Sequence, residues 1–111
     1  MKGIRFRCWI DIDGEKYFGP GPVQLLQLIE QEGSLSKAAK AMGMSYKKAW
    51  DIINHLNDKA TDPIVLSKTG GSKGGGAQLT IRGKQLIESY LELTSKLEAV
   101  VAENKQLLDL I

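Results

Sequence analysis

The sequence predicts a mainly α-helical winged helix-turn-helix fold with a small amount of β structure, an N-terminal β-hairpin and a long C-terminal helix. Residues 35–56 have the small, apolar and glycine positions of two short helices joined by a sharp turn. Residues 64–80 are two β-prone runs around a glycine-rich loop, and residues 81–111 repeat apolar positions every three or four residues. We therefore divide the chain into a winged domain, residues 1–80, and a long helix, residues 81–111.

The N-terminal segment is typical of a hairpin. Residues 4–12 alternate apolar and polar side chains, which predicts a half-buried strand. Asp13-Gly14 is a strong tight-turn dipeptide, and residues 15–18 are expected to form a short return strand. Trp9 falls on the polar side, so we expect it to cover a helix or a partner chain. Cys8, the single cysteine, excludes an internal disulfide and is expected to be a small buried apolar residue.

A first helix is expected over about residues 22–31. Pro22 suits its first turn, where a missing N–H costs nothing, and Gly33 is placed to end it. Either Ser34 or Ser36 then caps the next helix, and a hydroxyl at such a position can also meet a phosphate.

The helix-turn-helix prediction depends on small residues that let two helices approach closely. Gly43 lies where the chain must turn sharply and can adopt a positive φ. An ordinary helical hairpin, with Gly43 as a simple loop residue, is the alternative. The residues expected at the contact between the helices are Ala38, Ala39, Met42, Met44, Ala49 and Ile52.

The second helix of the motif, expected over about residues 45–57 with Ser45 as its N-cap, would be a DNA recognition helix. Lysine can meet phosphate or guanine, asparagine can pair with adenine, and Tyr46 could reach a phosphate or a thymine methyl group. Asp51 would read cytosine or orient a neighbouring lysine. Trp50 is expected in the core or an interface, and His55 on the helix surface. The outer face carries Tyr46, Lys47, Lys48, Asp51 and Asn54.

A strand, a glycine-rich loop and a second strand directly after a recognition helix predict a wing. Five glycines in residues 70–76 allow close approach to another molecule. The loop lacks the spacings G-x-x-x-x-G-K-[ST] and G-x-G-x-x-G, so a nucleotide phosphate loop is disfavoured. The expected contacts to a flanking phosphate or minor groove are Lys68, Thr69, Gly71 and Lys73.

The charge distribution agrees with a nucleic-acid partner. The chain has a net charge of only +2, but residues 36–84 carry nine basic and three acidic residues, a net charge of +6. Residues 85–111 carry two basic and five acidic residues, a net charge of −3. A concentrated positive field is expected where phosphates are bound, although a solvated basic face is the alternative.

The C-terminal residues predict a helix that Thr80 caps and that continues to the end of the sequence. About thirty helical residues would span roughly 45 Å, which is more than this domain can cover. We expect the helix to pair with its copy in a second subunit, with Asn104 fixing the register. The alternative is packing on its own domain, which is expected only for the first two turns. The seam residues are Leu86, Tyr90, Leu93, Leu97, Val100, Asn104, Leu107 and Ile111.

Together these segments resemble the molybdate-responsive ModE-type transcriptional regulators, whose N-terminal domain is a LysR-type winged helix. The resemblance covers roughly residues 15–111. It is carried by GSLSKAA at residues 33–39, SYKKAWD at residues 45–51, the glycine-rich stretch at residues 69–76, and LTIRG at residues 79–83.

The resemblance implies a homodimeric winged-helix protein that binds double-stranded DNA. It places at the DNA the wing and Ser34, Ser36, Ser45, Tyr46, Lys47 and Lys48. Full-length members carry C-terminal molybdate-binding domains, whereas this sequence stops at Ile111. If the protein is complete, we expect either constitutive DNA binding or a signal from a separate effector-sensing protein.

The sequence predicts a prokaryotic, sequence-specific transcriptional regulator. A protein–protein adaptor built from the winged helix and the long helix is the alternative. One histidine, one cysteine and scattered carboxylates supply no catalytic constellation, so no enzyme activity, cofactor or metal site is expected. No apolar run approaches the roughly 20 residues that span a bilayer, and we expect a cytoplasmic protein with no membrane partner.

Overall fold

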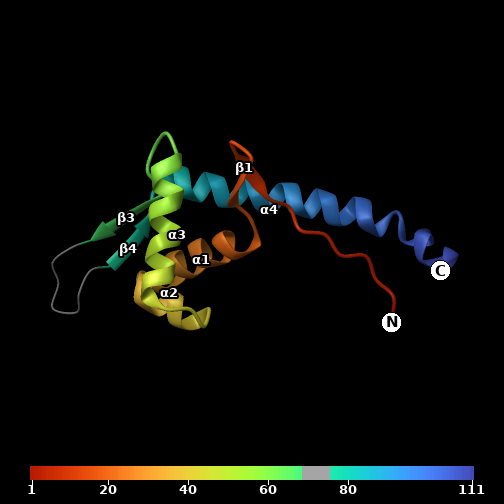
Figure 1. Cartoon of the computed structure of the whole chain (residues 1–111), viewed down its shortest axis with the longest axis horizontal. Helices are drawn as coiled ribbons and strands as arrows, with labels where there is room; N and C mark the ends of the chain where they lie inside the picture. Colours follow the sequence, from red (N-terminus) through yellow and green to blue (C-terminus); the bar gives the residue numbers. More distant parts are fainter. Residues whose placement is uncertain (69–75) are drawn as a thin grey trace.

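A computed structural model describes residues 1–68 and 76–111. The winged domain lies at one end of the molecule and the long helix α4 extends away from it (Figure 1). The structure confirms the predicted mainly α winged helix-turn-helix fold. The elements in chain order are β1 (Ile10–Ile12), β2 (Glu15–Phe18), α1 (Pro20–Glu32), α2 (Leu35–Ala41), α3 (Tyr46–Lys59), β3 (Val65–Lys68), β4 (Gly76–Leu79), α4 (Ile81–Ala102) and the 3-10 helix η1 (Lys105–Leu110).

The N-terminal hairpin is shorter than the sequence predicts. Asp13 and Gly14 have φ of 52° and 81°, the left-handed values that a two-residue hairpin turn requires, and β1 pairs antiparallel with β2. The predicted strand over residues 4–12 is correct only for Ile10–Ile12. Because β2 has four residues and the chain then enters α1, no partner strand remains for the preceding segment. Residues 4–8 instead line a groove beside α4.

Trp9 covers the start of α1, which confirms the expectation that it covers a helix. Its indole ring occupies the space beside Gly19 where any Cβ would lie, so only glycine fits at this N-cap. The ammonium group of Lys16 lies 4.9 Å from the centre of the Trp9 ring, a cation–π contact. Cys8 is half-buried, and its carbonyl accepts a hydrogen bond of 2.8 Å from the hydroxyl of Tyr90.

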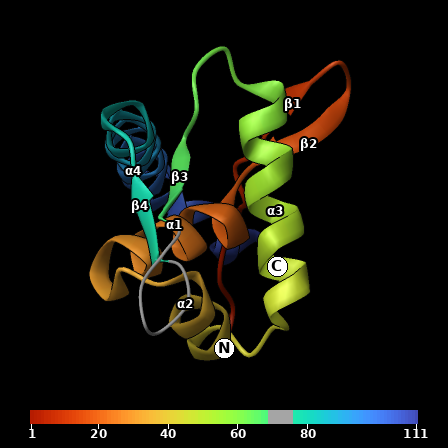
Figure 2. The same cartoon turned by 90° about the vertical axis from the view of Figure 1, so that its left-hand side faces the viewer.

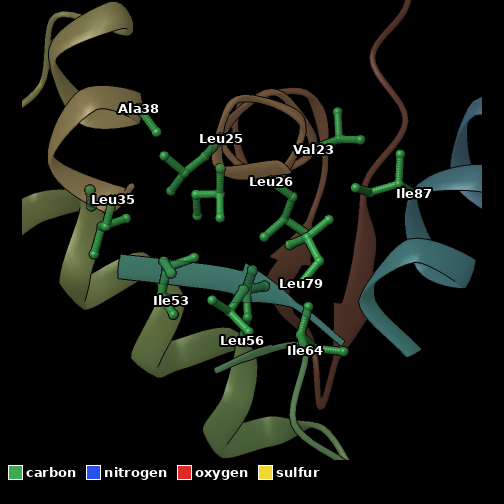
Figure 3. Packing of buried hydrophobic residues seen from close by; sticks show 14 of the residues in the cluster. Val23, Leu25, Leu26, Leu35, Ala38, Ile53, Leu56, Ile64, Leu79 and Ile87 are labelled. Carbon is green, nitrogen blue, oxygen red and sulfur yellow. The ribbon is translucent and has the colours of Figure 1, made fainter. Parts of the chain in front are cut away.

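Helix α1 is the centre of the core. In Figure 3 its side chains meet those of α2, α3, β4 and α4. Figure 2, which views α4 nearly end-on, shows α3 on one side of the domain and α4 on the other. The ring of Phe18 packs edge-on against Tyr90 with centroids 5.2 Å apart, which ties the hairpin to α4. The fully buried side chains of greatest volume are Phe18, Leu25, Leu26, Ile29 and Leu56.

Helix α4 ends before the sequence predicts. The expected helix to Ile111 is wrong beyond Ala102, because the Asn104 side chain donates to the carbonyl of Val100 and the chain tightens into 3-10 geometry. Leu86 is half-buried and Tyr90 is buried, so the first turns pack on their own domain, as the alternative anticipated. Within the described residues no helix combines the length and apolar content required to cross a membrane.

The start of α4 is fixed by Thr80 and Gly83. The Thr80 hydroxyl accepts from the Gly83 N–H at 3.0 Å and donates to the Pro63 carbonyl at 2.7 Å. The Thr80 N–H donates to the Ile64 carbonyl at 3.0 Å. A Cβ on Gly83 would overlap the carbonyl oxygen of Ile64, so only a glycine lets α4 approach the backbone of Ile64 this closely.

We predict that Gly83→Ala lowers the free energy of unfolding by about 1–3 kcal/mol, because the new methyl group pushes α4 off Ile64. The matched control is Gly21→Ala in α1, where a Cβ would meet nothing within 4 Å. Urea denaturation followed by circular dichroism measures both. A Gly83→Ala protein as stable as the control would show that this close approach is absent in solution.

Candidate nucleic-acid interface

The turn between α2 and α3 has the geometry that the sequence predicts. Gly43 has φ of 68°, and the N–H of Met44 donates to the carbonyl of Ala39 at 3.0 Å, which closes the turn. Ala39 of α2 and Ala49 of α3 are buried, with 2% and 0% of their surface exposed. Because both side chains are single methyl groups, they leave room for α2 and α3 to pack closely against each other.

Two serines cap the helices of the motif. Ser34 Oγ accepts from the Lys37 N–H at 3.2 Å, and Ser45 Oγ accepts from the Lys48 N–H at 3.1 Å. The expected caps at Ser34 and Ser45 are confirmed, whereas Ser36 lies exposed inside α2 and is not the cap. Each cap satisfies an amide of the first helical turn and fixes the point where the helix begins.

The outer face of α3 is polar and exposed. Ala49, Ile53 and Leu56 turn inward and are buried, which leaves the opposite side of the helix free. The ammonium group of Lys47 lies 3.3 Å from a carboxylate oxygen of Asp51, so Asp51 orients a lysine, one of its two expected roles. The exposed residues of this face are Tyr46, Lys47, Lys48, Asp51 and Asn54, which the structure brings together as predicted.

Trp50 also lies on the surface. It is 38% exposed, so the core, one of its two expected placements, is wrong, and the other, an interface, stays a prediction. The sequence is ambiguous here because Trp50 falls between the inner and outer positions of α3. His55 is exposed, as expected, and its ring centre lies 5.9 Å from that of Tyr17.

The two strands of the wing pair antiparallel, from Val65 opposite Leu79 to Lys68 opposite Gly76. Val65 and Leu79 are buried, and the N–H of Ala77 donates to the carbonyl of Gly33 at 3.3 Å, which joins β4 to the end of α1. Lys68 is the last residue of β3. The other wing residues that the sequence nominates, Thr69, Gly71 and Lys73, lie outside the described residues.

Asn57 connects α3 to the wing, a role that the sequence analysis missed. Its amide oxygen accepts from the N–H groups of Ile64 and Val65 at 2.8 and 3.1 Å, and its amide nitrogen donates to the carbonyl of Val65 at 2.9 Å. These three bonds fix β3 against the last turns of α3. The sequence signal for this role is only an asparagine near the expected end of a helix, seven residues before a β-prone run.

Tyr17 attaches the hairpin to the same end of α3. Its hydroxyl donates to the carbonyl of Leu56 at 2.6 Å. Burial raises the pKa of Tyr17, which keeps the hydroxyl protonated and able to donate. Burial, with a smaller contribution from Cys8, likewise raises the pKa of Tyr90.

The chain is similar to several curated bacterial proteins. It is 40% identical over 95 residues to the molybdenum transport protein ModE of Azotobacter vinelandii, a match of 84% of this chain and 35% of that protein. It is 46% identical over 71 residues to the DNA-binding transcriptional dual regulator ModE of Escherichia coli K12, covering 64% of this chain and 27% of the relative. The chain is a homologue of the ModE transcriptional regulators.

A third ModE relative, a transcriptional regulator of Haemophilus influenzae, is 36% identical over 90 residues, which are 81% of this chain and 35% of that protein. The chain thus spans about a third of the length of these relatives. No protein-family model matches it. The ModE-type motifs quoted above have clear structural roles, since SYKKAWD forms the N-cap and first turns of α3 and LTIRG makes the close approach of Gly83 to Ile64.

We predict that Asn57→Ala lowers the free energy of unfolding by about 2 kcal/mol, because it leaves partly buried amide and carbonyl groups of Ile64 and Val65 without partners. Asn54→Ala, three residues earlier on the exposed face, is the control and should change stability by less than about 0.5 kcal/mol. Denaturant titration of both variants measures the difference, and equal stabilities would remove Asn57 from this role.

Proposed function

We propose that the chain binds double-stranded DNA in a sequence-specific manner as a homodimer and regulates transcription without catalysis, in the bacterial cytoplasm. The observation that carries the proposal is the exposed face of α3, whose opposite face is fixed in the core. Side chains near the start of a recognition helix reach base edges in the major groove. The name of the Escherichia coli relative, a DNA-binding transcriptional dual regulator, supports the same function here.

In this proposal the lysines of α3 contact phosphate or guanine, Asn54 pairs with adenine, and the wing lies on the flanking backbone. The net charge of +6 over residues 36–84 attracts the DNA backbone. The proposed DNA contacts are Ser34, Ser36, Ser45, Tyr46, Lys47, Lys48, Asp51 and Asn54, with Lys68, Thr69, Gly71 and Lys73 of the wing.

We assign dimerisation to the middle of α4. Leu93 and Val100 are 44% and 54% exposed, and with the half-buried Leu97 they share one face at spacings of four and three residues. Tyr90 is part of the core of its own chain, and Asn104 lies beyond the helix, so the proposed seam is narrower than the sequence predicts. A two-fold pairing of this face would present two recognition helices to a pseudo-palindromic site.

We predict that Lys47→Ala weakens binding to operator DNA and reduces the slope of log affinity against log salt concentration by about one unit, the effect of losing one phosphate contact. Lys96→Ala is the control, because Lys96 is an exposed lysine on α4 paired with Glu92. Fluorescence anisotropy at several salt concentrations measures both slopes. Identical slopes for the two variants would favour the alternative, a protein–protein adaptor.

We also predict that Val100→Glu converts the dimer to a monomer, because it places a charge in the apolar seam of both subunits. Ser95→Glu adds the same charge at an exposed position on another face of α4 and should leave the dimer intact. Sedimentation velocity at micromolar concentration distinguishes the two states. A Val100→Glu protein that remains dimeric would place the interface elsewhere.

A further inference from the structure

The outer face of α3 carries exposed aromatic surface in addition to the polar side chains proposed to contact DNA. Tyr46 is 57% exposed and Trp50, one turn later, is 38% exposed, so the two aromatic side chains are neighbours on the helix surface. Single exposed apolar residues are common, but two adjacent aromatic side chains beside Lys47 on a proposed DNA-reading face call for a partner.

The position of this aromatic pair on α3 is defined by Asn57. Asn57 follows Trp50 by seven residues, close to two helical turns, so both lie on the same edge of the helix. Because Asn57 bonds to Val65, that edge is the one that adjoins β3 of the wing. Trp50 therefore lies between the polar side chains of Lys47 and Asn54 on one side of the helix surface and the wing strands on the other.

The major groove offers one apolar feature to such a side chain. Hydrogen-bond donors and acceptors distinguish the bases along the groove floor, and only thymine adds a methyl group, at C5. Burying the remaining exposed surface of the indole ring against that methyl group removes apolar surface from water on both sides, which is favourable. Burying it against a phosphate or a polar base edge would remove water from polar groups without supplying hydrogen bonds in return, which is unfavourable.

We propose that Trp50, assisted by Tyr46, determines specificity by packing on the C5-methyl group of thymine in the major groove. This inference rests on the proposed DNA-binding function and adds to it a base preference that the lysines and Asn54 do not provide. In this proposal Lys47 and Asn54 hydrogen-bond to polar groups of the bases, and Trp50 contacts the thymine methyl group, which makes no hydrogen bond.

The test uses deoxyuridine, which keeps every hydrogen-bonding group of thymidine and lacks only the methyl group. An operator is first selected from random duplexes, and each thymine of a half-site is then replaced in turn. We expect at least one replacement to weaken binding by the wild-type protein by about fourfold, the value for losing one buried methyl group. Trp50→Ala should bind the two operators equally, while Ile81→Ala, a change at an exposed position outside the interface, should retain the difference.

The outcomes separate the two hypotheses. A specific motif whose binding is insensitive to every deoxyuridine replacement would overturn the thymine contact and leave the proposed function standing. A Trp50→Ala protein that still distinguishes thymine from deoxyuridine would also overturn it. Selection that returns no motif would overturn both. Because the deoxyuridine scan uses the wild-type protein, it can overturn the thymine contact even if Trp50→Ala is unstable.

Discussion

The structure depends on a chain of hydrogen bonds centred on Ile64. The side chain of Asn57 in α3 binds the N–H of Ile64, and the carbonyl of Ile64 accepts from the backbone N–H of Thr80. Thr80 in turn caps α4, where Gly83 allows the helix to touch the Ile64 backbone. One short segment thus fixes α3, the wing strands and α4 relative to one another. A displacement of any of the three disturbs the other two.

This constraint explains how α3 can present a free face. The buried side chains of Ala49, Ile53 and Leu56, the Ser45 cap and the Tyr17 hydroxyl hold α3 along its length, and none of these contacts uses the outer side chains. The polar side chains of the outer face are left exposed on a helix held by the core, next to the aromatic side chains of Tyr46 and Trp50. Such pre-organisation reduces the entropy lost on binding, which favours affinity without any additional contact.

Much of the fold could be predicted because its signals are local. Asp13-Gly14, Gly43, Ser45 and Thr80 each determine a turn or cap through their own backbone preferences, and the structure places each as expected. The exposed face of α3 could also be predicted, because helical spacing alone separates its residues from the buried Ala49 and Ile53.

The failures are places where a side-chain hydrogen bond or a packing partner overrides the local pattern of the sequence. Residues 4–8 alternate as a strand would, but a partner strand of four residues cannot pair with them, and they line a groove beside α4 instead. The regular apolar spacing beyond Ala102 predicts a helix, but the Asn104 side chain competes for the carbonyl of Val100. Asn57 was missed because its partners, Ile64 and Val65, are identified only once β3 is folded back on α3.

The most direct measurement of the central claim is selection from a pool of random duplex DNA at two salt concentrations, followed by sequencing of the bound fraction. The account predicts a motif of two halves related by two-fold symmetry, with affinity that falls steeply as salt increases. Weak binding without sequence preference at both salt concentrations would contradict it and would favour a protein-binding role for the winged domain and α4.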